Sequence, residues 1–400
     1  MLNVLSQERA LEIILSQVSE IEKNNEDIPL LQAVSRIAAK DIDSFENIPH
    51  FNRSTVDGFA LRASDTFGCS ESLPAMLRFK GKIIMGEDRA LSIDGGECME
   101  IPTGGMLPEN ADAVSMVEYT ENYGDEFRYI QKPAAPLENV IRTGEDVSKG
   151  QKVIEKGTVL RIQEIGVLSA LGIDIVSVKK PLTVGIISTG DEIIPFTEKP
   201  KGSQIRDINS SLLAAAAAGT FCRSMNYPIV PDDERKLQKA VRTALDECDA
   251  LLISGGSSAG EKDAVSRVLS ALGTVHFHGI AIKPGKPTVF ATASGKPVFG
   301  LPGHPVAAYF VFRLFVRTML YKMLGVKQND LCFNAVISQN IPSDHGREEI
   351  IPVSIKNGIA SPVFGKAGII SVLSRADGYI IIGRNSEGVL KGEAVKVYLF

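Results

Sequence analysis

Three apolar runs decide the fold of this chain, and each ends in a loop rich in glycine or proline. They read LTVGIISTGDE (182–192), ALLISGGSSAG (250–260) and PVFGLPGHP (297–305). Short runs with many branched residues, separated by helical patterns, are typical of buried parallel strands. In an open α/β sheet, the loops at the carboxyl ends of such strands line one crevice. We therefore expect the three loops to offer backbone N–H groups, hydroxyls and acids to a common ligand.

The segments around these runs predict a central three-layer α/β/α domain with a mostly parallel sheet. Capped helical patterns lie at 209–218 and 231–245, a third helix is expected from Asp263, and a fourth spans 306–324. Strands are expected near residues 182, 227, 250, 274, 288 and 297.

The length of 400 residues predicts more than two domains, because single cores stop growing beyond roughly 250–300 residues. Helical spacing is expected over 6–18, 30–39 and 162–171, whereas 60–130 holds short alternating runs with many glycines. The expected domains are an extended discontinuous one (1–47 with 140–176), a β-rich inserted one (48–139), the α/β domain (177–326) and a C-terminal β-barrel-like one (327–400).

Composition excludes several classes of function. The formal charge of -5 and the lack of a long basic run argue against nucleic acid as a partner. No apolar stretch reaches about 18 residues, the length needed to span a membrane. The N-terminal residues do not show the pattern of a secretion signal, so a cytoplasmic protein is expected. The 5 cysteines are scattered without a C-x-x-C pair, which predicts neither a disulfide framework nor a structural zinc site.

A series of motifs follows in order along the chain and carries a family resemblance. They are IPHFNRSTVDGFA (48–60), IPTGG (101–105), RTGED (142–146), STGDE (188–192), QIRDINS (204–210), SGGSSAGEKD (254–263), KPGKP (283–287) and LPGHP (301–305). Together they resemble MoeA, the molybdopterin molybdenumtransferase family of molybdenum cofactor synthesis. The resemblance extends from about the first helix to the last strand.

The resemblance implies an elongated homodimer of four-domain subunits. The α/β domain of one subunit and the β-rich domain of the other would form a shared cleft. The family takes adenylylated molybdopterin and molybdate, cleaves the phosphoanhydride with the help of Mg²⁺, inserts the metal and releases AMP. A molybdopterin adenylyltransferase is one candidate partner, and the delivery partner is left open.

The residue types in the motifs suit this chemistry. Magnesium prefers one or two carboxylates with water and phosphate oxygens, and Asp191, Glu192 and Asp57 are the implied ligands. Lys283 and Lys286, each followed by a proline, would present cationic donors to an oxyanion. The resemblance implies catalytic roles for Asp57, Thr103, Asp146, Glu192 and Asp263, and binding roles for Ser188, Gly190, Ser210, Asp232, Gly255, Gly256, Ser257, Lys283, Lys286, Pro302 and Pro305.

Each candidate also has an ordinary structural interpretation. Asp232 and Asp263 precede helical patterns and could act as acids at helix N-termini. Asp57, just before a glycine, is typical of a turn, and Lys283 and Lys286 could be solvated loop charges. The resemblance favours ligand contact over these interpretations.

The C-terminal segment departs from the family pattern. Ala367 and Pro352 stand where many relatives have a serine and an arginine thought to hold the oxyanion. The preference for molybdate over tungstate is therefore left open. Two other functions remain: a molybdopterin-binding scaffold without turnover, which the intact acid set disfavours, and the preceding adenylylation step, which the additional β domains disfavour.

Overall fold

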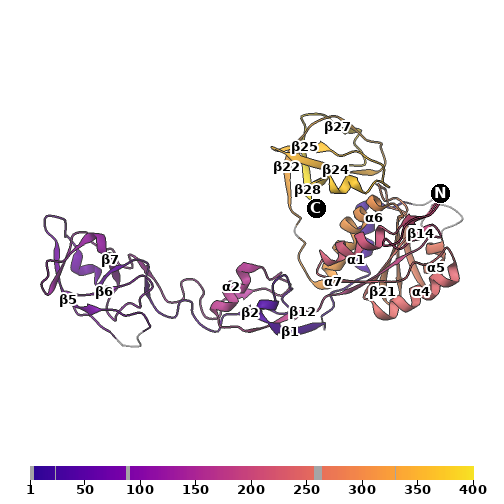
Figure 1. Cartoon of the computed structure of the whole chain (residues 1–400). Helices are drawn as coiled ribbons and strands as arrows, with labels where there is room; N and C mark the ends of the chain where they lie inside the picture. Colours follow the sequence, from indigo (N-terminus) through magenta and orange to yellow (C-terminus); the bar gives the residue numbers. More distant parts are fainter. Residues whose placement is uncertain (1–3, 23, 87–90, 256–263, 329) are drawn as a thin grey trace.

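The computed structural model describes residues 4–22, 24–86, 91–255, 264–328 and 330–400. The chain forms an elongated molecule with an α/β lobe and a C-terminal barrel at one end, a middle lobe, and a β-rich lobe at the other end (Figure 1). The expected division into several domains of mixed helix and strand is confirmed. Among the described residues, no helix combines the length and the apolar character needed to cross a bilayer.

The α/β lobe is built on a six-stranded sheet with the order β16-β13-β17-β21-β20-β18. Strands β16, β13, β17 and β21 run parallel; at one edge β20 pairs antiparallel with β21, and β18 pairs antiparallel with β20. The strands are β13 (Thr183–Ser188), β16 (Arg223–Asn226), β17 (Ala250–Ser254), β18 (Gly273–His278), β20 (Val289–Ala293) and β21 (Lys296–Leu301), with a small parallel pair, β14 (Ile193–Ile194) and β15 (Ile205–Arg206), outside the sheet.

Helices cover both faces of this sheet, which explains why its central strand β17 is buried at every position. In β17, Ala250 and Leu252 join the core shared with α3, whereas Leu251 and Ile253 join the core shared with α4 and α5. The helices are α1 (Gln7–Ser16), α3 (Asn209–Ala218), α4 (Glu234–Glu247), α5 (Ala264–Leu272), α6 (Pro305–Val311) and α7 (Arg317–Leu324), the last two joined by a π-helical turn, η4 (Phe312–Val316).

Three parallel strands end at the same level. Ser188 lies opposite Ser254 in the ladder, and Ser254 lies opposite Leu301. The loops that follow β13, β17 and β21 therefore leave from one edge of the sheet, as the sequence predicted.

The C-terminal lobe is a closed barrel of five strands. The order β24-β25-β22-β28-β26 closes on itself because β26 also pairs with β24. A short strand of the α/β lobe, β19 (Ile282–Lys283), pairs with β24 and joins the two lobes. The barrel-like prediction is confirmed by β22 (Cys332–Ile337), β24 (Glu348–Lys356), β25 (Ile359–Pro362), β26 (Gly378–Ile382) and β28 (Ala394–Leu399), accompanied by β23 (Ile341–Pro342), α8 (Ser371–Ser374) and β27 (Gly388–Val389).

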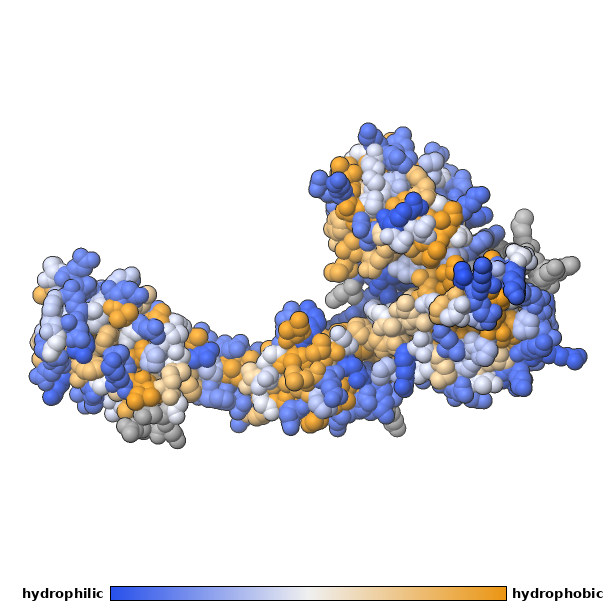
Figure 2. All heavy atoms as spheres, viewed as in Figure 1, coloured by the Kyte–Doolittle hydropathy of each residue, from blue (hydrophilic) through white to orange (hydrophobic). Residues whose placement is uncertain are grey.

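The middle lobe corrects one prediction, the helix over 30–39. Only a 3-10 turn forms, at Leu30–Gln32; Ser35 then takes φ 62, and Ala38 forms a bridge with Val178. Long-range pairing therefore overrides the local helical spacing. The lobe contains β1 (Asn25–Pro29), β12 (Ile175–Lys179), β2 (Ile42–Asp43), β11 (Lys152–Ile154) and the predicted helix α2 (Ile162–Ala170). Figure 2 shows apolar residues gathered on its surface near α2.

The β-rich lobe holds a second six-stranded sheet, with the order β7-β4-β6-β5-β9-β8. Its strands are β4 (Gly58–Leu61), β5 (Ala75–Lys82), β6 (Glu97–Ile101), β7 (Ala113–Met116), β8 (Thr120–Glu121) and β9 (Phe127–Ile130). A short antiparallel pair, β3 (Arg53–Ser54) with β10 (Val140–Ile141), closes the end of the lobe at which the chain enters and leaves.

Candidate active site

A cavity of about 710 Å³ opens at the carboxyl edge of the α/β sheet. Its walls come from the loops after β13, β17 and β21 and from the segment around Lys286. The predicted site residues that line it are Ser188, Gly190, Glu192, Asp232, Gly255, Lys286, Pro302 and Pro305.

Close backbone packing holds two of these loops together. Gly255 has φ +104, and a Cβ atom at this position would stand 2.1 Å from the carbonyl oxygen of Thr189. The same two loops are also joined by a hydrogen bond, in which the Thr189 N–H donates to the Ser254 carbonyl at 2.9 Å. Position 255 therefore requires glycine both for its backbone conformation and for the approach of the neighbouring loop.

Two buried polar atoms of the cavity residues have no hydrogen-bond partner among the described residues: Ser188 Oγ and Asn209 Oδ1. The amide nitrogen of Asn209 is occupied, since it donates to Ser254 Oγ at 2.6 Å and to the Gly303 carbonyl at 2.8 Å. An unpaired buried polar atom is costly, so these two atoms are suited to a polar ligand.

The sequence analysis gave Asn209 no role of its own, although this residue stands both in the capped helical pattern at 209–218 and in the QIRDINS motif. Its side chain does not cap α3. Its place directly before an apolar helix, three residues after Arg206 in the QIRDINS motif, is the signal that could have marked it.

The two acids before α4 separate into a cap and a cavity residue. Asp233 is the N-cap, because its carboxylate accepts from the Lys236 N–H at 2.9 Å, a bond that lowers the pKa of Asp233. Asp232 instead lines the cavity, where its Oδ1 lies 3.4 Å from Thr189 Oγ1. The Asp232 N–H donates to Asp191 Oδ1 at 3.1 Å, which brings the two acidic segments together.

Asp191 and Ser210 line an adjoining cavity of about 560 Å³. It shares Gly190, Ile193 and Asp207 with the first cavity, so the two spaces lie on either side of one loop. The Ser210 N–H donates to Asp207 Oδ1 at 3.0 Å. Asp191 and Ser210 thus belong to the same region as Glu192 but face a different part of it.

The two candidate lysines lie in different surroundings. Lys286 lines the first cavity. Lys283 is not among its lining residues: the Lys283 ammonium lies 3.0 Å from Glu349 Oε1 and 3.7 Å from Asp344 Oδ2, both in the C-terminal lobe. The sequence pattern offered no sign of these acidic partners.

Asp57 and Thr103 meet in the β-rich lobe. Asp57 Oδ1 accepts from the Thr103 N–H at 2.6 Å and from Thr103 Oγ1 at 2.9 Å. These bonds, the backbone one first, lower the pKa of the Asp57 carboxyl. Because this lobe lies at the far end of the molecule (Figure 1), the pair does not join the α/β cavity of its own chain.

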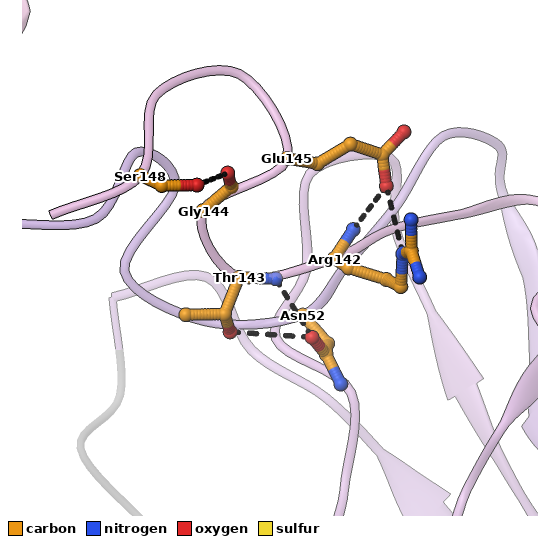
Figure 3. Close-up of polar contacts among 6 residues, drawn as sticks. All are labelled: Asn52, Arg142, Thr143, Gly144, Glu145 and Ser148. Atoms are coloured by element: carbon orange, nitrogen blue, oxygen red, sulfur yellow. Dashed lines mark hydrogen bonds and ion pairs between the residues drawn. The ribbon is translucent and has the colours of Figure 1, made fainter. Parts of the chain in front are cut away.

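The loop that carries Asp146 is fixed against the base of the β-rich lobe (Figure 3). Asn52 Oδ1 accepts from the Thr143 N–H at 2.9 Å and from Thr143 Oγ1 at 3.2 Å. The Asp146 N–H donates to the Ile48 carbonyl at 3.1 Å, and the Asp146 residue is exposed. Asp146 therefore also lies outside the α/β cavity within one chain.

The remaining sequence candidates are placed as follows. Gly256, Ser257 and Asp263 lie outside the described residues. Pro352 is buried in the barrel wall opposite Tyr379 and does not line the cavity. The Ala367 carbonyl accepts from the Val306 N–H at 3.1 Å, and the next residue, Gly368, lines the cavity, so this segment of the barrel lies over the start of α6.

Comparison with known proteins identifies the family. Three models match in order: "MoeA N-terminal region (domain I and II)" over residues 5–172, "Probable molybdopterin binding domain" over 185–322, and "MoeA C-terminal region (domain IV)" over 334–400. The chain belongs to the MoeA family. The resemblance inferred from the motifs is thereby confirmed.

Full-length relatives agree with this assignment. A putative molybdopterin biosynthesis protein of Methanocaldococcus jannaschii is 37% identical, with 99% of this chain and 98% of that protein covered. The molybdopterin molybdenumtransferase of Haemophilus influenzae is 33% identical, with 93% of each chain covered. The crystal structure of the molybdopterin biosynthesis MoeA protein from Pyrococcus horikoshii OT3 covers both chains fully at 35% identity, with a TM-score of 0.89. The relatives' names support the predicted transferase class.

The acids of the cavity can be tested as ligands of the implied Mg²⁺. Among the described residues, no three His, Cys, Asp or Glu side chains gather into a metal site. Glu192 and Asp232 line the cavity and Asp191 adjoins it. A few carboxylates beside an open cavity fit magnesium, which usually keeps several waters and binds through one or two carboxylates and substrate phosphates.

Proposed function

We propose that this chain inserts molybdenum into adenylylated molybdopterin, with molybdate as the other substrate, and releases AMP. The observation that carries the proposal is the cavity at the sheet edge. It combines an acid, Glu192, and a cation, Lys286, with the two unpaired buried atoms, Ser188 Oγ and Asn209 Oδ1. A pterin nucleotide would need both donors and acceptors of this kind.

The polar residues of the cavity can be given separate roles in this reaction. Cleavage of a phosphoanhydride requires the charge on its non-bridging oxygens to be balanced. Lys286 supplies positive charge, and the Ser188 hydroxyl supplies a hydrogen-bond donor. Asn209 Oδ1 accepts from an N–H or O–H group and so orients the bound nucleotide. Mg²⁺ bound through Asp191 and Glu192, with Asp57 of a second subunit, would supply further charge neutralisation.

We also propose that the working site is shared in a homodimer. Asp57, Thr103 and Asp146 can reach an α/β cavity only from another copy, because Asp57 and Thr103 lie in the distant lobe of their own chain and Asp146 lies at the base of that lobe. Apolar side chains exposed on the middle lobe support such an interface. They are Leu31, Val34, Ile162 and Ile175, exposed by 81%, 45%, 81% and 51%.

The test is AMP release by the purified protein with adenylylated molybdopterin, Mg²⁺ and molybdate. Turnover is expected, and the double variant Asp191→Asn, Glu192→Gln should lose it. The matched control is Glu198→Gln, an exposed acid in the same region that lines neither cavity. It should keep wild-type turnover.

The same assay separates the other functions considered from sequence. Tight binding of the adenylylated pterin without AMP release would indicate a scaffold. Formation of adenylylated molybdopterin from ATP and molybdopterin would indicate the preceding step. Either result in place of molybdate-dependent AMP release would overturn the proposal.

A further inference from the structure

A separate cavity of about 310 Å³ lies between the α/β lobe and the C-terminal barrel. It has no lining residue in common with the two cavities at the sheet edge. One wall comes from the helical segment around Tyr309 and Phe312, and the other from the end of the chain, Leu399 and Phe400. In Figure 1 the C-terminus lies on the side of the barrel that faces the α/β lobe. We call this space the seam cavity.

Two arginines that line the seam cavity, Arg313 and Arg317, share one acid. Both guanidinium groups pair with Asp330 Oδ1, that of Arg313 at 3.5 Å and that of Arg317 more closely. Arg313 also donates to the Leu399 carbonyl at 2.6 Å. Two positive charges thus meet one carboxylate oxygen, and the positive charge is in excess.

These guanidinium groups are buried and not fully paired. Arg317 is only 8% exposed, and the Nε atoms of both arginines have no hydrogen-bond partner among the described residues. Among the described residues, the ion pairs of both arginines are formed with Asp330 alone. Buried charge of this kind is unfavourable without a counter-charge, so the seam cavity favours an anion.

Aromatic rings form a further part of the cavity wall. Phe400 packs edge-on to Tyr309, with 5.4 Å between ring centroids and 80° between ring planes. The guanidinium of Arg317 lies 5.5 Å from the ring centroid of Tyr321. The Tyr309 hydroxyl makes no hydrogen bond with a described residue. Burial raises the pKa of Tyr309 to about 12, so at neutral pH this hydroxyl is a donor.

We infer that the seam cavity binds a small monoanion with a flat apolar body, such as an aromatic carboxylate. Its carboxylate would accept from the arginines and from Tyr309, and its ring would lie among the aromatic side chains. The volume is at the lower end of the roughly 300–1,000 Å³ of ligand pockets, which limits the ligand to one or two rings. Because its walls belong to both lobes, such a ligand would also bind the barrel to the α/β lobe.

Benzoate and its neutral analogue benzamide test this inference by titration calorimetry on the full-length protein. Benzoate should bind at one site per chain, and benzamide at least about tenfold more weakly, because a hydrogen bond to a charged group is stronger than a neutral one. Lys286→Gln, which changes the active-site cavity, should leave benzoate binding intact. Equal affinity for benzoate and benzamide would overturn the inference, as would loss of binding in Lys286→Gln.

A matched pair of variants locates the site without disturbing the arginines. Ala216 lines the seam cavity, whereas Ala215, on the same helix α3, is exposed and does not. Ala216→Leu should fill the space and abolish benzoate binding, and Ala215→Leu should bind like the wild type. Unchanged binding by Ala216→Leu, with both variants folded by circular dichroism, would place benzoate elsewhere and refute the inference.

Discussion

The substitution Gly255→Ala probes the packing of the active-site loops most directly. The new methyl group would stand 2.1 Å from the Thr189 carbonyl oxygen, whereas real Cβ atoms essentially never come closer than 3.0 Å. The two loops must therefore separate by about 0.9 Å. Thr189 and Gly255 both line the cavity, so this movement displaces its walls directly.

The expected effect follows from that displacement. A misplacement of about 1 Å at a catalytic site can lower the rate by about 100-fold. A non-glycine residue held at φ +104 adds a strain of about 1–3 kcal/mol. Gly255→Ala should thus lose most of its molybdate-dependent AMP release and should melt a few degrees below the wild type, at about 2–4 °C per kcal/mol for a domain of this size.

Gly303→Ala is the matched control in the same cavity. Its φ lies outside the left-handed region, and its new Cβ would meet only Gly255 Cα, at 3.8 Å, an ordinary contact. Turnover should remain near the wild-type value, and the melting temperature should be unchanged. If calorimetry and the AMP assay gave the same result for both variants, the close approach of the two loops would not govern the site, and the reasoning would be refuted.

Three further predictions concern the acids. Asp233→Ala should lower the melting temperature through loss of the α4 cap while turnover persists. Asp232→Asn should instead lower turnover and leave the melting temperature unchanged. Thermal unfolding and AMP assays on both variants would contradict this if the two effects were exchanged. Mixing subunits that carry Asp57→Asn with subunits that carry Glu192→Gln should restore about a quarter of wild-type activity, because half of the random dimers are mixed and each of these keeps one of its two clefts intact. No recovery of activity would contradict a shared cleft. Thr103→Val should raise the pKa of Asp57 towards its ordinary value, since a hydrogen bond to the ionised form is lost; a carboxyl titration by NMR that showed no rise would contradict this. The stabilisation from ionised Asp57 is present above its ordinary pKa and disappears as the pH falls through the lowered folded value, so in Thr103→Val it should be lost at higher pH than in the wild type.

The α/β lobe could be predicted well because local signals and tertiary structure agree there. Strand β17 is buried on both faces and therefore shows an unbroken apolar run. Helix α4 buries one side only, and Leu237, Val241 and Ala244 recur at helical spacing along that side. The helix predicted over 30–39 does not form, because Ser35 takes a positive φ and residues of this segment pair with distant strands.

Within the site, most of the described candidates that line one cavity lie on the three sheet-edge loops. Strand register alone brings those loops together. The environment of Lys283 could not be predicted, because its acidic neighbour Glu349 lies on a barrel strand that pairs with β19 only in the folded chain. Asn209 was overlooked for a related reason, since its bonds to Ser254 and Gly303 join segments that are far apart in sequence.

The positions of the acids give the shared-site proposal its physical basis. The Asp57 carboxylate is held ionised by Thr103 on an exposed part of the β-rich lobe, where its own chain brings no cation within ion-pair distance among the described residues. The α/β cavity, in turn, has Lys286 and unpaired polar atoms but lacks that acid. The elongated chain keeps the Asp57 lobe and the α/β cavity apart. In a two-fold dimer, one isologous interface can bring the Asp57 lobe of each subunit to the α/β cavity of the other and so form two clefts. The distance between the lobes is therefore what we expect of a subunit whose active site is completed by a second copy.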